Sequence, residues 1–173
     1  MSKTQGRGET IAQWWRVNLA ARDSGQARAL AARLRRATPV EALAEAEVHR
    51  LASRIGLGRH PSDAARLARL VQVLAHLRED AGQSLAARLG GPEPKLSNLR
   101  FQRLLRSQGD ELTTALRRAL PMVERRCNVA RLGQDMLNWD HPEWGDAVRA
   151  GWCFDYFGAP PPQAETHSTE VSS

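Results

Sequence analysis

Arginine is the residue whose type and spacing give this sequence its chemistry. Of the 25 basic residues, 23 are Arg and only Lys3 and Lys95 are Lys. A guanidinium is planar, stays charged, and offers five N–H donors in a fork that matches phosphate or carboxylate oxygens. The composition therefore favours a polyanionic partner, and the alternative is that Arg simply solvates exposed helix faces. The positions of the arginines decide between the two.

The charge is divided unevenly along the chain. Residues 1–131 hold 24 basic and 12 acidic side chains, a net charge of +12, whereas residues 132–173 hold one Arg and seven acids, a net charge of −6. The basic part gathers its arginines without matching acids: residues 97–131 contain eight Arg and three acids, and residues 26–37 contain four Arg and none. An ordinary solvated helix intersperses the two signs, because like charges repel and Glu–Arg pairs stabilise it.

Phosphates would supply the missing negative charge through counterion release and guanidinium hydrogen bonds. At about 100° per residue, the arginines of residues 97–126 lie beside or opposite the apolar arcs of their helices. We expect this set to contact a nucleic-acid backbone: Arg100, Arg103, Arg106, Arg117, Arg118 and Arg125. For residues 26–37 both interpretations stay open, because Arg stems also cover the edges of a core.

Base reading and catalysis are not indicated. The tryptophans fall at the two ends of the fold and are interpreted as core or interface anchors, not as a platform on which bases stack. The histidines and cysteines share no zinc-ligand spacing, and no phosphate-binding glycine motif occurs. Four carboxylates are interpreted as capping and solvating residues and not as a two-metal nuclease centre: Asp135, Asp140, Glu143 and Asp146. We therefore expect a protein that is not an enzyme and that has no catalytic, cofactor-binding or metal-binding residues.

The sequence also predicts the compartment. No charged and apolar leader and no run of about 18 apolar residues is present, so we expect neither secretion nor membrane insertion. The two cysteines, Cys127 and Cys153, are expected to be reduced thiols in the cytoplasm.

Apolar residues recur at intervals of three and four almost throughout, which predicts an all-α protein with no strand. Thr38, Ser97, Asp110 and Asn128 are suited to begin helices, and Gly158 is suited to end the last one. The predicted helices cover residues 9–22, 26–37, 39–55, a segment after Pro61 that includes Leu67 to Leu77, 85–89, 97–107, 110–126 with a kink or split at Pro121, 128–138, and a last one ending near 157.

The strongest break in the helical pattern is Gly90-Gly91-Pro92-Glu93-Pro94. It predicts two small helical bundles in tandem, one over residues 9–90 and one over residues 91–158. Residues 1–8 are expected to be flexible. Residues 159–173 are polar and rich in Pro, with too little apolar surface to pack, and are expected to form a disordered tail.

Several segments resemble the CasB family, the small subunit of the type I-E CRISPR surveillance complex Cascade. The resemblance covers roughly Ile11 to Gly158, and its specificity comes from the order of the segments together with the length and the basic, helical character. The matching segments are WWRVNL (14–19), ARLRRAT (32–38), LSNLRFQRLLRS (96–107), LTTALRRALPMV (112–123), DMLNW (135–139) and VRAGWCFDYFG (148–158).

The resemblance implies a non-enzymatic subunit of two helical bundles that is present as two copies in head-to-tail contact. It implies contacts with other Cascade subunits and with the backbones of the guide RNA, the target DNA strand and the displaced non-target strand, which steady the R-loop. The family's basic surface would fall on Arg35, Arg36, Arg100, Arg103, Arg106, Arg117 and Arg118. The N-terminal extension and the acidic tail depart from the family's pattern.

Two other functions fit the composition. A free-standing helix-turn-helix regulator would need polar, base-reading side chains on a short recognition helix, and the Leu and Arg repeats of residues 97–107 fit that poorly. A scaffold bundle would use the same arginine faces to bind acidic protein surfaces.

Overall fold

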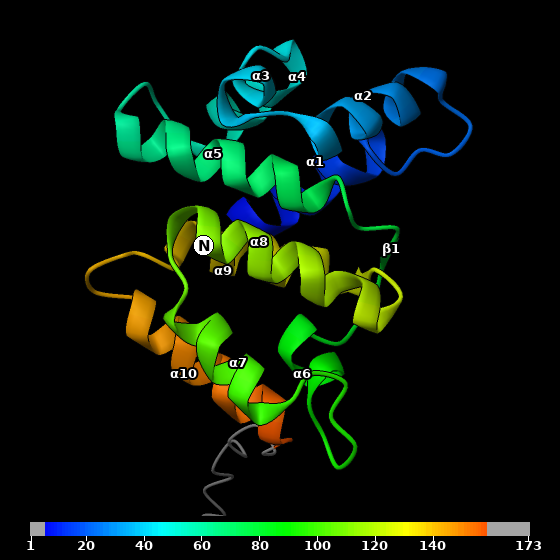
Figure 1. Cartoon of the computed structure of the whole chain (residues 1–173). Helices are drawn as coiled ribbons and strands as arrows, with labels where there is room; N and C mark the ends of the chain where they lie inside the picture. The colour runs from blue at the N-terminus through cyan, green and yellow to red at the C-terminus, as the bar shows by residue number, and fades with distance from the viewer. Residues whose placement is uncertain (1–5, 159–173) are drawn as a thin grey trace, which may run out of the picture.

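The computed structural model describes residues 6–158, and within that range it is almost entirely helical (Figure 1). The predicted all-α fold is confirmed, and none of the described helices is long and apolar enough to cross a membrane. The elements are α1 (Gly6–Asn18), α2 (Gly25–Arg36), α3 (Pro39–Leu43), α4 (Ala46–Ile55), α5 (Pro61–Leu74), β1 (Glu79–Asp80), α6 (Leu85–Leu89), α7 (Asn98–Arg106), α8 (Gly109–Ala119), the 3-10 helix η2 (Leu120–Val123), β2 (Arg126–Cys127), α9 (Val129–Asn138) and α10 (Gly145–Phe157).

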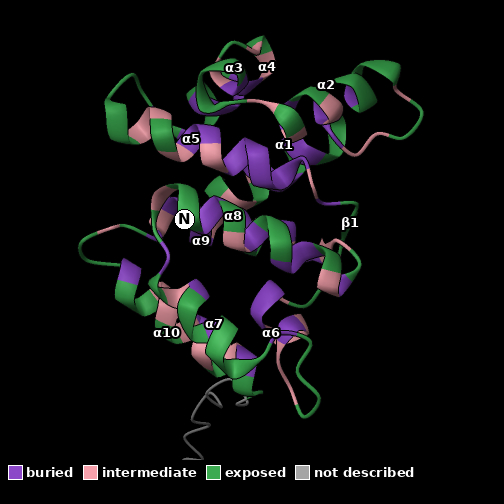
Figure 2. Ribbon diagram, in the orientation of Figure 1, coloured by how far each residue is buried: buried purple, intermediate pink, exposed green. Residues whose placement is uncertain are grey.

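The buried apolar side chains form one continuous cluster that runs from Ile11 to Tyr156. Helix α5 is buried along most of its second half and packs against α8 and α9, and α9 lies along α1 (Figure 2). Trp14 and Trp139 are among the largest fully buried side chains. Burial of each large apolar side chain contributes about 1.5–3 kcal/mol, which is why the predicted tryptophan anchors lie here.

Several predicted helix ends are confirmed. Thr38 Oγ1 accepts from the backbone N–H of Glu41 at 3.3 Å, and Glu41 Oε2 accepts from the N–H of Thr38 at 2.7 Å, a complete capping box. Ser97 and Asn128 cap α7 and α9 in the predicted manner. Pro121 splits its helix as expected, because α8 ends at Ala119 and η2 carries the chain past the proline.

Other boundaries differ from the predictions. The helix expected over residues 39–55 is interrupted at Ala44 and Glu45, so that α3 and α4 are separate. Asp110 does not cap α8, which already begins at Gly109 and has no side-chain cap. The expected flexible start extends too far, because residues 6–8 form the first turn of α1. Gly8 there packs so closely on α9 that a Cβ atom would lie 2.7 Å from the carbonyl oxygen of Ala130. Residues 1–5 and the predicted disordered tail, 159–173, lie outside the described residues.

A two-residue parallel pair of strands, β1 and β2, was not predicted, because segments this short leave no periodic signal. The pair continues into the preceding turn, where the carbonyl of Arg125 accepts from the N–H groups of Arg78 and Glu79 at 2.9 and 3.4 Å. Glu124 and Arg125 both have left-handed backbone conformations, with φ of 59° and 57°. The strand pair thus holds a strained turn that places Arg125 beside Arg78 and Glu79, in the segment after α5.

The Gly90–Pro94 segment is a loop tied to α10. Gly91 donates its N–H to the carbonyl of Tyr156 at 2.8 Å, and Tyr156 donates its hydroxyl to the carbonyl of Leu96 at 2.5 Å. The division into two bundles at this loop stays a prediction. The packing adds that α6 precedes the loop yet lies against α10, and that α9 follows the loop yet lies against α1.

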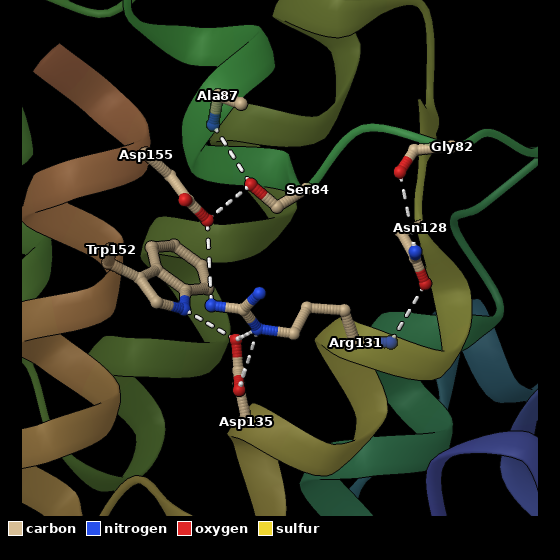
Figure 3. A network of polar contacts seen from close by, with 8 residues as sticks. All are labelled: Gly82, Ser84, Ala87, Asn128, Arg131, Asp135, Trp152 and Asp155. Carbon is tan, nitrogen blue, oxygen red and sulfur yellow. Dashed lines mark hydrogen bonds and ion pairs between the residues drawn. The ribbon is translucent and has the colours of Figure 1, made fainter. Parts of the chain in front are cut away.

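A polar network fixes α9 to α10 and α6 (Figure 3). Asp135 is buried and accepts from Arg131 Nε at 3.0 Å and from Trp152 Nε1 at 2.8 Å. Arg131 also contacts Asp155 at 3.5 Å, and Asp155 accepts from the hydroxyl of Ser84 at 2.7 Å. Burial raises the pKa of Asp135, and Arg131 and Trp152 oppose that shift. The network shows that Asp135 has a structural use.

Candidate nucleic-acid interface

The eight arginines predicted as binding residues share one property. None of them forms an ion pair with a carboxylate among residues 6–158, whereas nine other arginines in that range do. Arg33, for example, pairs with Glu45 at 2.6 Å, and Arg126 pairs with Glu79 at 3.0 Å. The eight predicted residues are Arg35, Arg36, Arg100, Arg103, Arg106, Arg117, Arg118 and Arg125. Six other arginines of the described residues also lack a carboxylate partner: Arg7, Arg28, Arg54, Arg59, Arg78 and Arg88.

Three of these arginines surround one groove, which we call the α7/α8 groove. Arg100 and Arg103 come from α7 and Arg118 from α8, and no acidic residue lines the space of about 540 Å³ between them. The remaining lining residues are small or apolar, apart from one serine: Leu96, Leu104, Ser107, Ala115, Ala119 and Met122. The groove therefore presents guanidinium groups over an apolar floor.

The amphipathic pattern of the two helices builds this groove. Phe101 and Leu104 are buried and turn the basic side of α7 outward, and Leu112 and Leu116 do the same for α8. Phe101 stacks on Tyr156 with ring centroids 4.0 Å apart, which holds α7 against α10. Leu96 and Met122, which also line the groove, were not predicted as site residues. Their only sequence signal is their position beside the cap Ser97 and after the break at Pro121.

A second group of predicted arginines lies outside the groove and consists of Arg35, Arg117 and Arg125. Arg117 Nη2 donates to the carbonyl of Arg35 at 3.0 Å, which joins α8 to the end of α2. Burial, together with the charges of Arg117, Arg125 and Arg35, lowers the pKa of the nearby His76 to about 4. Its Nε2 has no hydrogen-bond partner within the described residues. Burial is the largest cause of this lowered pKa, and the positive charges of the three arginines add to it.

Two predicted residues lie apart from both groups. Arg106 is exposed in the last turn of α7 and does not line the groove. Arg36 lines a shallow hollow that also contains Glu41 and Glu45. Hydrogen bonding from Arg33 lowers the pKa of Glu45, so this hollow already contains its own negative charge. The structure thus brings together six of the eight residues, in two sets that meet at the neighbouring positions Arg117 and Arg118.

Three of the four carboxylates of residues 135–146 pair with arginines within the fold, and Asp135 is the buried one described above. Asp140 pairs with Arg69 at 3.0 Å, and Asp146 pairs with Arg149 at 2.7 Å. Over the part of the chain that the structure describes, no three His, Cys, Asp or Glu side chains are grouped so that they could hold a metal ion. Trp14, Trp15, Trp139 and Trp152 are buried, and Trp144 is the one half-exposed tryptophan of the described residues.

Together these features define a class of protein: a small, basic, all-helical subunit whose arginines are left without carboxylates along one groove and its flank. The family follows from comparison with known proteins. Residues 30–157 match the family model of the CRISPR-associated protein Cse2. Because that match covers well over half of the chain, the chain belongs to the Cse2 family, and the resemblance to CasB inferred from the sequence is confirmed.

Relatives from one organism illustrate the match. A CRISPR-associated protein Cse2 of Thermus thermophilus is 40% identical over 60 residues, which are 35% of this chain and 34% of that relative, so the aligned segment spans about a third of its length. The crystal structure of CasB from Thermus thermophilus has 26% identity and a TM-score of 0.68, and the match covers 92% of this chain and 100% of that one. A second crystal structure, of a Cse2-family protein from the same species, has 24% identity and shares the fold with a TM-score of 0.63 over 89% of this chain and 99% of its own.

Proposed function

We propose that this chain is the small subunit of a type I-E CRISPR Cascade complex, where it binds the phosphate backbones of the guide RNA, the target strand and the displaced strand. In this role it stabilises the R-loop, contributes no catalytic step, and acts in the cytoplasm. The observation that carries the proposal is that the eight predicted arginines have no carboxylate partner within residues 6–158, and that three of them surround one groove.

The physical basis is electrostatic. Each phosphate that meets a guanidinium releases condensed counterions and gains a charge-assisted hydrogen bond. The groove has an apolar floor and no acidic lining residue, so a phosphate entering it meets no repelling carboxylate on the groove surface. Backbone contacts carry no sequence information, and base pairing between guide and target supplies the specificity. A groove that binds phosphates without reading bases is suited to a subunit whose complex takes its specificity from base pairing.

The acidic end of the chain supports protein contacts in the same complex. Residues 132–173 have a net charge of −6, opposite to the rest of the chain. In α10, Phe154 and Phe157 are each 65% exposed, and Trp144 just before it is 52% exposed. Aromatic residues are enriched at protein interfaces. We assign this end to contacts with other Cascade subunits and with a second copy in head-to-tail arrangement.

The proposal is tested by the lifetime of the R-loop in a reconstituted complex. The groove variant combines Arg100→Ala, Arg103→Ala and Arg118→Ala. Dissociation of the R-loop is followed by fluorescence as the displaced strand pairs again with the target strand. We expect the R-loop of the groove variant to dissociate at least tenfold faster than that of the wild type, with normal assembly of the complex.

The matched control removes three positive charges elsewhere: Arg7→Ala, Arg54→Ala and Arg59→Ala, which lie on α1, α4 and the loop after α4. None of these arginines lines the groove or forms an ion pair within the described residues. We expect this control to keep the wild-type lifetime. An unchanged lifetime in the groove variant, or the same loss in both variants, would contradict the proposal.

A further inference from the structure

A second concave site lies between helix α2 and the segments that follow α1 and α5. Four arginines line it: Arg22, Arg28, Arg35 and Arg78. Its other lining residues are apolar and include Leu19 and Leu77, both of which are buried. The space is about 470 Å³, within the range of small-molecule sites. We call it the α2/α5 pocket.

Backbone contacts hold these arginines in place. Arg28 Nη1 donates to the carbonyl of Arg22 at 3.2 Å, and Arg35 Nη1 donates to the carbonyl of Ala75 at 3.3 Å. The main chain of Arg78 is fixed by its hydrogen bond to the strained residue Arg125. A guanidinium carries five N–H donors, so these anchors leave most of the donors of Arg28 and Arg35 available to a ligand.

The negative charge at the pocket is small. Of the four lining arginines, only Arg22 has a carboxylate partner among the described residues, Glu79 at 3.6 Å. Both side chains of that pair are largely exposed, and Glu79 is shared with Arg126 at 3.0 Å. Surface pairs of this kind contribute little, so Glu79 competes weakly with an anion. Arg117 adds further positive charge, because it donates to the carbonyl of Arg35.

We propose that the α2/α5 pocket binds an oligophosphate, the di- or triphosphate chain of a nucleotide, with the nucleoside side toward Leu19 and Leu77. A nucleic-acid backbone carries one charge per nucleotide, whereas a triphosphate concentrates several charges within one pocket's width. Four arginines around a concave apolar surface match the triphosphate better than an extended backbone. The triphosphate can belong to a free nucleotide or to the 5′ end of an RNA. This site goes beyond the proposed function, because three of its arginines were not among the predicted backbone contacts.

The test is calorimetric titration of the full chain with inorganic triphosphate, ATP, AMP, and an RNA oligonucleotide with either a 5′-triphosphate or a 5′-hydroxyl end. We expect triphosphate and ATP to bind, and AMP to bind at least tenfold more weakly. The 5′-hydroxyl RNA measures what the RNA backbone alone contributes. Binding of the 5′-triphosphate RNA that is tighter than that of both the 5′-hydroxyl RNA and ATP would assign the ligand to an RNA end, and equal binding of the two RNAs together with binding of ATP would assign it to a free nucleotide. Absence of binding by both inorganic triphosphate and ATP would overturn the proposal.

Variants separate this pocket from the α7/α8 groove. Arg28→Ala with Arg78→Ala should weaken triphosphate binding at least tenfold and leave the salt dependence of DNA binding nearly unchanged. Arg100→Ala with Arg118→Ala removes the same charge and should do the opposite. Equal loss of triphosphate binding in both would show a general charge effect and overturn the proposal. If the first variant fails to fold, Arg28→Lys with Arg78→Lys replaces it. These lysines keep the positive charges but lack the forked N–H donors of a guanidinium, so triphosphate should bind several-fold more weakly than to the wild type.

Discussion

At the scale of single residues, carboxylate partners separate two kinds of arginine. Arg131 pairs with Asp135 on its own helix and with Asp155 on α10, whereas Arg100, Arg103 and Arg118 have no acidic partner within the described residues and line a groove. Surface ion pairs contribute about 0–1 kcal/mol each, so leaving an arginine unpaired costs the fold little. The unpaired arginines are therefore free to serve binding without a large loss of stability.

Burial of His76, together with the charges of Arg117, Arg125 and Arg35, makes the stability of the fold depend on pH. Its pKa is lowered from 6.5 to about 4, so the unfolded chain binds a proton at a higher pH than the folded protein. The stability that this residue contributes is fully present above pH 6.5 and is lost as the pH falls toward 4. After allowance for solvent screening of a half-buried group, we expect the loss to be of the order of 1–2 kcal/mol.

The measurement is chemical unfolding of the wild type and of His76→Gln between pH 4 and pH 8. The variant should show a smaller decrease in the free energy of unfolding over pH 6.5 to 4, because glutamine does not titrate. Parallel curves for the two proteins would show that His76 is not held neutral in the folded protein.

Asp135 gives the second prediction at this scale. Asp135→Ala removes a buried acceptor from both Trp152 Nε1 and Arg131 Nε, so a buried donor is left without a partner. We expect a loss of about 2–4 kcal/mol in the free energy of unfolding, read from denaturant titration. Asp146→Ala, which removes an exposed carboxylate paired with Arg149, is the control and should cost less than about 1 kcal/mol. Similar losses in the two variants would contradict the structural assignment of Asp135.

At the scale of elements, a close approach between the loop after α6 and helix α10 positions the groove. A Cβ atom on Gly90 would lie 1.9 Å from the carbonyl oxygen of Tyr156, whereas one on Gly82 would meet nothing within 4 Å. Tyr156 in turn donates its hydroxyl to the carbonyl of Leu96, which lines the groove, and stacks on Phe101, which lies on the buried side of α7. Groove geometry therefore depends on this backbone contact.

Gly90→Ala should destabilise the protein by about 3 kcal/mol or more, because backbone atoms on both sides must shift. Gly82→Ala is the matched control, with an expected change within about 0.5 kcal/mol. Thermal unfolding of both variants, followed by circular dichroism, distinguishes them. A Gly90→Ala protein with the melting temperature of the wild type would contradict the close contact between Gly90 and the backbone of Tyr156.

Local signals explain which elements were predictable. Thr38, Ser97 and Asn128 cap their helices by accepting from the N–H three residues further on, and Pro121 interrupts the helical turn in which it lies. These interactions are local, so the sequence alone locates the helix ends. The break at Ala44 and the start of α8 before Asp110 depend on packing against other helices, which local propensity does not report. The strand pair depends on Glu79 meeting Arg126, far along the chain.

The sequence predicted which arginines of the candidate site are exposed, but not which of them lack a carboxylate partner. Helical projection gave the exposed arginines, because the apolar arcs of α7 and α8 fix the outward directions. Which of them remain unpaired depends on partners distant in sequence: Arg33 meets Glu45, and Arg126 meets Glu79. For the same reason the sequence did not separate Arg106 from the groove, nor identify Arg28 and Arg78 as lining a common pocket.

At the scale of the whole molecule, the chain combines a basic region with an acidic end. Residues 1–131 and 132–173 carry net charges of +12 and −6. Within the described residues, both regions contribute side chains to the same hydrophobic cluster. In the proposed complex, the basic surface binds nucleic-acid backbones and the acidic end with its exposed aromatic residues meets protein.

The central claim, that the unpaired arginines of the α7/α8 groove bind phosphates, is tested most directly by the salt dependence of DNA binding. Affinity is measured by fluorescence anisotropy at several salt concentrations for the wild type, the Arg100, Arg103 and Arg118 triple Ala variant, and the Arg7, Arg54 and Arg59 control, each on two unrelated sequences. Each lost phosphate contact should flatten the slope of log affinity against log salt by roughly 0.7–0.9, hence by about 2 to 3 for the groove variant. The control should keep the wild-type slope, and neither sequence should be preferred. A groove variant with the wild-type slope, or a marked preference for one sequence, would contradict the account.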